Sequence, residues 1–338
     1  LADVFDSVFG VTLPMELTTP PFASGTATGA WFNLPAFLVL MVLTWLLVRG
    51  VRESARTNNI MVAIKVGAVL VFIFGAVDAV NPSNWSPYMP NGFTGVITGA
   101  AIVFFTYIGF DSVSTASEEC TNPKRDVPIG IIGTLLICTV LYVGVAAVLT
   151  GIVDWRTLSN AAPVANALKD LGYHNVRRIV SIGALIGMIS SLLVFQYGQA
   201  RVWFAMSRDR LMPGAFSRVH PKYKTPHIST WVAGLFVGIP AGIWDIGTFA
   251  DLSSIGTLFA FVLVAAGVLV LRKRDPDRPR RFRVPFSPVV PILSILTCLI
   301  LMMGLPLEAW LRFVIWLVIG LVIYFVWGRK RADATFPA

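Results

Sequence analysis

The stretch FFTYIGFDSVSTASEECTNPKRD, residues 104–126, closes a long apolar segment and carries the strongest fold signal in the chain. It places a glycine and a carboxylate, Gly109 and Asp111, inside roughly twenty residues that should cross a bilayer. Glycine weakens a helix, and a charge at that depth is costly unless a partner offsets it. Transporters use this combination, because an unwound helix presents backbone carbonyls and amides to a polar substrate at mid-membrane. We therefore predict a broken helix near residues 107–109.

The composition is that of a polytopic membrane protein. Of 338 residues, 56% are hydrophobic and 13% are charged, whereas soluble domains carry about 25% charged residues. The three cysteines and three histidines are scattered without the spacing of a disulfide framework or a metal site. No nucleophile motif or phosphate-binding loop points to an enzyme. We expect a membrane protein without catalytic function, metal or cofactor.

Hydropathy predicts nine membrane spans, so the expected fold class is an all-α polytopic bundle. At about 1.5 Å per residue each span is long enough for a hydrocarbon core of about 30 Å, the sixth only just. The spans run near residues 33–50, 60–80, 95–117, 129–151, 178–205, 228–244, 249–271, 289–307 and 310–327.

Lysine and arginine, 27 in all, gather on alternate loops. This asymmetry predicts that the basic loops and the tail at 329–338 are cytoplasmic, and that residues 1–30 form an extracellular loop. The net charge of +9 then reflects topology and attraction to anionic lipid head groups, and nucleic acid is not an expected partner. The predicted location is the cell membrane (inner or plasma membrane), crossed many times.

Residues 95–128 resemble the sixth helix and following loop of bacterial relatives of the cationic amino acid transporters. These belong to the amino acid–polyamine–organocation superfamily, which has the leucine-transporter fold. Similar supporting stretches stand in the family's order: RGVRESARTNNIMVAIK (49–65), GQARVWFAMSRDRLMP (198–213) and DRPRRFRVPFSPVVP (277–291).

The resemblance implies that the nine spans are the family's helices four to twelve, and that the chain is an amino-terminal truncation. Residues 31–80 would be the last two helices of repeat one. Residues 95–271 would form repeat two, with five helices, and residues 285–328 the closing helix pair.

The same resemblance gives the predicted break a substrate-binding role. Tyr107, Ile108 and Gly109 would free carbonyls for a substrate ammonium. Phe105 matches the family's aromatic gate, with Phe104 beside it, and an aromatic face there could also contact a positive group. The pattern alone, without the resemblance, favours ordinary core or lipid-facing aromatic residues at Phe104, Phe105 and Tyr107.

Lys65 is the predicted proton-coupling residue. It lies about 7.5 Å along the second span, from where its stem could snorkel to the lipid head groups. The resemblance instead places its ammonium where sodium-coupled relatives bind a sodium ion, with Ser190 and Ser191 as the nearest hydroxyls. Burial makes loss of a lysine's proton feasible near neutral pH. Asp111 would steady the unwound segment and relay protons, or would cap the helix.

Glu118 and Glu119 follow the third span at the predicted cytoplasmic side. They are either an inner gate of ion pairs or a solvated helix end.

The predicted function is import of an L-α-amino acid, cationic or neutral, by proton symport with alternating access. An amino acid or polyamine antiporter, and a non-transporting receptor-like or inactive fragment, remain as alternatives. The expected partners are the amino acid, protons and membrane lipids. The family also allows an accessory single-span protein, which no residue of this sequence indicates.

Overall fold

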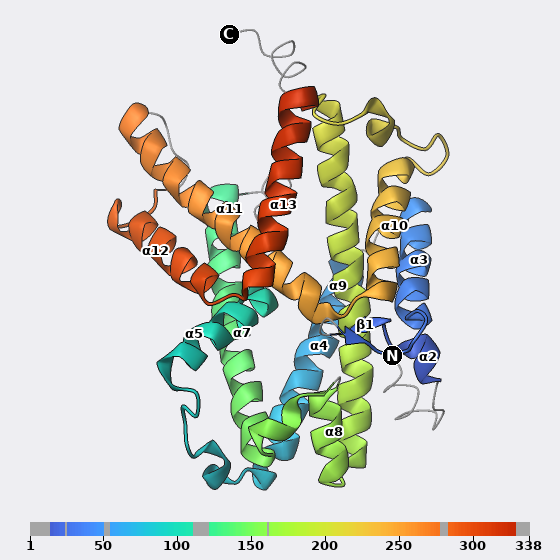
Figure 1. Ribbon diagram of the computed structural model, residues 1–338, viewed down its shortest axis with the longest axis vertical. Coiled ribbons are helices and arrows are strands. Elements are labelled where there is room, and N and C mark those ends of the chain that lie inside the picture. Colours follow the sequence, from blue (N-terminus) through green and yellow to red (C-terminus); the bar gives the residue numbers. More distant parts are fainter. Residues whose placement is uncertain are drawn as a thin grey trace. The chain divides into compact units, whose positions relative to one another are not determined.

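The computed structural model describes residues 14–23, 26–50, 55–110, 122–160, 162–277 and 283–328, and it is built almost entirely of helices (Figure 1). The helices are α2 (Met15–Thr18), α3 (Leu34–Val48), α4 (Ala55–Ala76), α5 (Gly92–Val103), α7 (Pro123–Ile152), α8 (Pro163–Asp170), α9 (His174–Arg208), α10 (His227–Ile243), α11 (Ile246–Arg274), α12 (Val289–Met303) and α13 (Leu307–Ile323). Short 3₁₀ turns join several of them, and a π-helical turn, Tyr324–Gly328, extends α13.

Five helical segments are long and apolar enough to cross a membrane, and four shorter helices are also apolar. The five are Asn59–Ala79, Lys124–Ile152, His174–Arg208, Phe249–Arg274 and Leu307–Val326, and the four shorter ones contain α3, α5, α10 and α12. These segments of the described chain correspond one to one with the nine predicted spans. The predicted all-α polytopic class is confirmed.

The helices divide into two compact units. One contains α3, α4, α8, α9 and α10, and the other contains α5, α11 and α12, while α7 and α13 have residues in both. This division by contacts cuts across the predicted repeat boundaries, which concern internal symmetry and stay a prediction.

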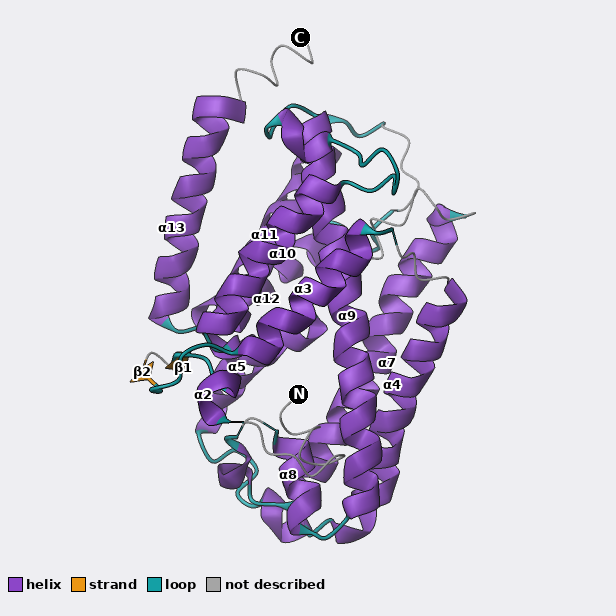
Figure 2. Ribbon diagram, turned by 90° about the vertical axis from the view of Figure 1, so that its right-hand side faces the viewer, coloured by secondary structure: helices purple, strands orange, loops and turns teal. Residues whose placement is uncertain are grey.

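In the first unit α9 is the central element, and α3, α4, α8 and α10 all contact it (Figure 2). A hydrophobic cluster joins Phe72 and Ala76 of α4 to Val148 and Ile152 at the end of α7 and to Leu168 of α8. Each side chain in this cluster is buried, so burial of apolar surface fixes this end of the unit.

Small residues bring α10 close to α3. A Cβ atom added at Gly234 would collide with the Thr44 side chain, and one at Gly238 would lie 2.9 Å from Met41 Cε. One turn further on, a Cβ at Gly242 would collide with the Phe32 ring. Glycines four residues apart lie on one face of a helix, and this arrangement is typical of close helix packing in membranes.

In the second unit α11 packs along α12, and α5 contacts both. Ile255 and Leu258 of α11, Met302 of α12 and Ala101 of α5 form its buried core. Trp310 Nε1 donates a hydrogen bond of 3.0 Å to Met302 O and so fixes the turn between α12 and α13.

The segment before α3, predicted only as a loop, contains regular structure. Besides α2 it holds a hairpin of two antiparallel strands, β1 (Phe22–Ala23) and β2 (Thr26–Ala27). Phe22 stacks on Trp244 with ring centroids 6.5 Å apart, and the Asn33 N–H donates to Gly242 O at 2.8 Å. The hairpin therefore packs on the end of α10.

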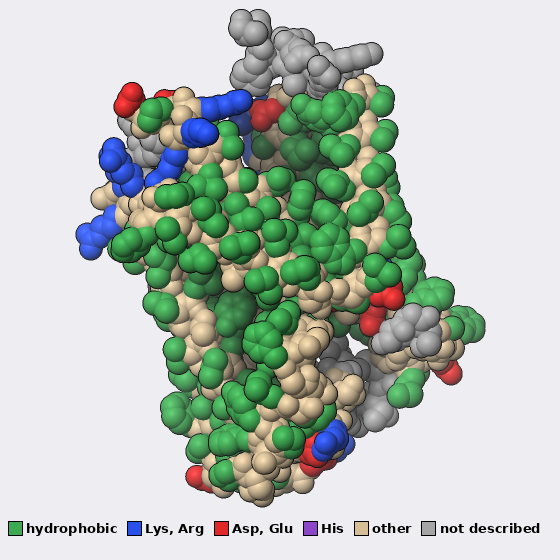
Figure 3. Space-filling view, turned by 60° about the vertical axis from the view of Figure 1, so that its left-hand side comes forward, with side chains coloured by type: hydrophobic (Ala, Val, Ile, Leu, Met, Phe, Trp, Pro, Cys, Tyr) green, Lys and Arg blue, Asp and Glu red, His purple; other side chains and the backbone are tan. Residues whose placement is uncertain are grey.

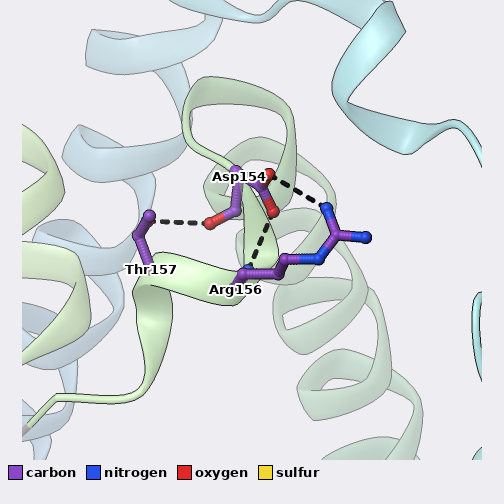
Figure 4. A network of polar contacts seen from close by, with 3 residues as sticks. All are labelled: Asp154, Arg156 and Thr157. Atoms are coloured by element: carbon purple, nitrogen blue, oxygen red, sulfur yellow. Dashed lines mark hydrogen bonds and ion pairs between the residues drawn. The ribbon is translucent and has the colours of Figure 1, made fainter.

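The turn after α7 is closed by a local polar network (Figure 4). The Asp154 carboxylate accepts from Arg156 N–H at 2.9 Å and pairs with the Arg156 guanidinium at 3.3 Å. Thr157 Oγ1 donates to Asp154 O at 2.8 Å. Exposed ion pairs contribute little to stability, so the network serves chiefly to cap the 3₁₀ turn Trp155–Leu158.

Hydrophobic side chains cover most of the face in Figure 3. Large apolar residues remain exposed along whole helices, for example Leu311, Val318 and Val322 of α13. Such a surface would aggregate in water, but it suits contact with lipid tails.

Candidate functional site

The helix break predicted at residues 107–109 is present. The α-helix α5 ends at Val103, a 3₁₀ turn covers Phe104–Tyr107, and Ile108 then adopts extended geometry with ψ 133°. Gly109 has φ +121°, a conformation that side-chain-bearing residues rarely adopt. The Ile108 N–H donates to Phe105 O at 3.2 Å, which closes the last 3₁₀ turn. A chain that leaves α-helical geometry in this way takes its backbone groups out of the regular i→i−4 ladder.

The aromatic residues at the break differ in their surroundings. Phe104 packs edge-on against Phe261 of α11, with ring centroids 6.2 Å apart and planes at 85°, and it borders the buried core of the second unit. Phe110 also contacts Phe261, at 5.5 Å. Phe105 and Tyr107 are half-buried. Phe104 thus has a packing role, and its predicted contact with substrate stays a prediction.

Three predicted site residues, Asp111, Glu118 and Glu119, lie outside the described residues. Their predicted roles in proton relay and gating stay predictions.

Lys65 and Ser191, predicted to act together, are joined by a hydrogen bond. Lys65 Nζ on α4 donates to Ser191 Oγ on α9 at 3.0 Å. Both side chains are half-buried, whereas the adjacent Ser190 is 1% exposed. Ser191 is therefore the hydroxyl that the lysine reaches, and the ammonium is directed toward α9.

A stripe of small residues on α9 makes room for this lysine. A Cβ atom at Gly187 would lie 3.0 Å from Lys65 Cγ and 3.4 Å from Lys65 Cε, so the absence of a side chain there leaves space for the lysine stem. One turn earlier, a Cβ at Gly183 would collide with Ala68 Cβ. Gly183, Gly187 and Ser191 are four residues apart and lie on one helix face.

Sequence reasoning did not single out Gly183 or Gly187. The signal was available as a small-residue repeat of period four inside an apolar span, which is typical of helix contacts in membranes. Nothing in the repeat itself says which helix it faces, because that depends on tertiary packing.

A second polar contact lies within the same unit. Gln196 Nε2 of α9 donates to Thr44 Oγ1 of α3, and the Thr44 hydroxyl donates in turn to Leu40 O at 2.6 Å. Gln196 is 8% exposed, and its Oε1 has no hydrogen-bond partner among the described residues. Such a bond orders the α3–α9 contact inside an apolar environment.

The described residues contain no group of three or more His, Cys, Asp or Glu side chains that could hold a metal ion. The polar features of the chain are instead a helix break, a lysine–serine pair and buried interhelical hydrogen bonds. Polar groups of this kind inside apolar spans are uncommon and often functional.

Comparison with known proteins identifies the family. The profile of the family described as amino acid permease matches residues 15–327. The chain belongs to this family. The predicted resemblance to the amino acid–polyamine–organocation superfamily is thereby confirmed.

Individual relatives of this permease are transporters. The chain is 49% identical to the branched-chain amino acid permease BcaP of Bacillus subtilis over 330 residues, which cover 97% of this chain and 70% of the relative. It is 47% identical to the methylthioribose transporter of the same organism over 324 residues, 96% of this chain and 70% of the relative. It is also 40% identical to the chloroplastic cationic amino acid transporter 9 of Arabidopsis thaliana over 269 residues, 79% of this chain and 47% of the relative. The protein is a multi-pass membrane transporter and not an enzyme.

Proposed function

We propose that this permease imports an L-α-amino acid with an apolar side chain by proton symport and alternating access. The break between Val103 and Gly109 carries the proposal. Carbonyl oxygens released from the helical ladder are suitable acceptors for a substrate ammonium, and they avoid the cost of a second charged side chain at that depth.

The described residues at the break, which do not include Asp111, favour an apolar substrate side chain over a cationic one. Phe105, Tyr107 and Ile108 are half-buried and carry no charge. A cationic side chain would call for a carboxylate or several oxygen acceptors in this low-dielectric environment. The 49% identity to a branched-chain amino acid permease supports the same substrate class.

Proton coupling is proposed to reside at Lys65. A charged ammonium on an apolar helix needs a partner, and Ser191 Oγ supplies one at 3.0 Å. Loss of the proton would weaken this link between α4 and α9, because the neutral amine is a poorer donor. The state of the lysine would then bias the conformation of the first unit. We also propose that the basic loops face the cytoplasm, as the charge asymmetry predicts.

Methylthioribose is a second candidate substrate, because the chain is 47% identical to a transporter of that compound. It has no α-ammonium group, so a backbone carbonyl at the break would have to accept from a hydroxyl instead. Competition for uptake separates the two candidates.

Uptake in proteoliposomes tests the proposal. With an imposed inward proton gradient, we expect accumulation of labelled leucine, competition by isoleucine and valine, and no competition by arginine or methylthioribose. Lys65→Met should abolish gradient-driven accumulation, because methionine keeps the stem but not the charge. Lys169→Met removes an exposed lysine elsewhere and should leave it unchanged.

Two results would contradict parts of this scheme. Uptake that requires amino acid inside the vesicles and ignores the proton gradient would indicate exchange. If methylthioribose competes for uptake and the amino acids do not, the substrate is methylthioribose.

A further inference from the structure

A cationic pocket lies on the first unit, at the end of the unit where α3 finishes and α10 begins. Its volume is about 130 Å³. Leu47 and Gly50 line it from the end of α3, Tyr197 and Arg201 from α9, and Lys224 from the loop before α10. Along α9 it lies two to three turns beyond Ser191, so it is separate from the lysine–serine pair.

The charges around the pocket attract an anion. Arg201 and Lys224 both line it, and none of its described lining residues is acidic. The Arg201 guanidinium lies 4.1 Å from the centre of the Tyr197 ring, a cation–π contact that holds the charge in place. The first turn of α10, a helix of 17 residues, adds the positive end of its dipole.

The pocket wall is fixed by backbone geometry rather than by loose side chains. Gly50 has φ +79°, and a Cβ there would lie 3.2 Å from Tyr223 O, so the loop approaches α3 closely. Thr225 Oγ1 donates to Val48 O at 2.7 Å and ties the two segments together. Lys224 has φ +56°, a left-handed conformation imposed by this turn. The walls are therefore present before any ligand binds.

The pocket also has the features of a membrane interface. At the end of α3, beside the pocket, the Arg49 guanidinium lies 3.9 Å from the centre of the Trp45 ring. Tryptophan, tyrosine and arginine are the residues that anchor helices at the level of lipid head groups. Beyond the pocket, the loop from Arg208 to Lys224 is rich in basic residues.

We propose that this pocket binds a phosphate group. A phosphate has several acceptor oxygens, and Arg201 and Lys224 both line this space beside the positive end of α10. The phosphate can come from the head group of an anionic phospholipid or from the aqueous phase, and the test distinguishes the two.

Lipid binding is measured by native mass spectrometry and by thermal unfolding of the protein in phosphatidylcholine nanodiscs with and without phosphatidylglycerol. Each cation is worth roughly fivefold in affinity near an anionic surface. We expect the Arg201→Gln/Lys224→Asn double variant to bind phosphatidylglycerol about twenty-five-fold more weakly. Lys224→Asn alone should lower the affinity for phosphatidylglycerol about fivefold. It keeps the test valid if the double variant misfolds, because asparagine tolerates a positive φ.

Arg218→Gln is the matched control. Arg218 lies in the same loop and is exposed, but it does not line the pocket. Its loss should change affinity by less than twofold, and an effect equal to that of Lys224→Asn would overturn the proposal in favour of diffuse surface attraction. Equal binding by the wild type and the double variant would also overturn it.

Inorganic phosphate, added to protein in phosphatidylcholine alone, identifies the source. Stabilisation by millimolar phosphate that the double variant loses would support the site with a soluble ligand. Stabilisation by phosphatidylglycerol that millimolar phosphate cannot displace would support it with a lipid ligand.

Discussion

Replacing Ser191 by alanine removes the hydroxyl that accepts from Lys65 Nζ at 3.0 Å. Hydrogen bonds to charged groups contribute about 1.5–3 kcal/mol, and the lower end applies because both side chains are half-buried rather than enclosed. A loss of about 1.5 kcal/mol corresponds to roughly a tenfold change in an equilibrium constant. We therefore expect Ser191→Ala to lower proton-driven leucine uptake about tenfold.

The double variant decides whether the two residues act as one unit. If the bond carries the effect, the unfolding free energies of Lys65→Met, Ser191→Ala and the double variant should show a coupling of about 1.5 kcal/mol in chemical unfolding. Ser190→Ala makes the same change one residue earlier on α9, where Lys65 makes no such bond, and it should keep proton-driven uptake. Additive losses of unfolding free energy in the double variant, or equal losses of uptake from the two serine variants, would refute the reasoning.

Three further substitutions test the fold around the site. Gly109→Ala should cost about 1–3 kcal/mol in unfolding experiments, because φ +121° strains any side chain. Gly99→Ala within α5, with open space around its Cβ, should be neutral or gain up to about 1 kcal/mol. Similar values for both variants would remove the argument for the break. Gly183→Ala should lower the free energy of unfolding by about 1–3 kcal/mol, because the added Cβ overpacks against α4. Gly198→Ala lies on the same helix, where an added Cβ meets nothing within 4 Å, and it should not lower the melting temperature. Gln196→Leu should change the free energy of unfolding by less than about 1 kcal/mol. It removes one interhelical hydrogen bond worth about 0.6 kcal/mol, and it also removes a buried oxygen that has no partner among the described residues. A loss above about 3 kcal/mol would show that the amide holds a larger network.

The sequence was sufficient for features that depend on local chemistry. A glycine and a carboxylate in an apolar span predicted the break, and the chain leaves α-helical geometry at Phe104, three residues before the predicted position. The early departure is a 3₁₀ turn, which tightens a helix end without any special residue type. Nine spans were recognisable because each is a long apolar run.

Features that depend on tertiary packing or short length were not predicted. The partner of the Gly183–Gly187 stripe is set by the approach of α4, which no local pattern encodes. The helix α8 and the β1–β2 hairpin are too short to produce a periodic signal. Hydropathy also placed the seventh span at 249–271, whereas α11 runs from Ile246 to Arg274. Its last turn is basic, and cations at the carboxyl end of a helix interact favourably with its dipole.

The length of α9 has a consequence for how the permease is exposed to its surroundings. Its 35 residues span about 52 Å, against roughly 30 Å of hydrocarbon. Even at a tilt of about 20° the surplus is on the order of 20 Å, so part of the rod must protrude from the bilayer. If the protruding part is the carboxyl-terminal end, the arginines around position 208 lie in the aqueous phase. Trypsin sealed inside vesicles, or added outside them, would then cut there from one side only.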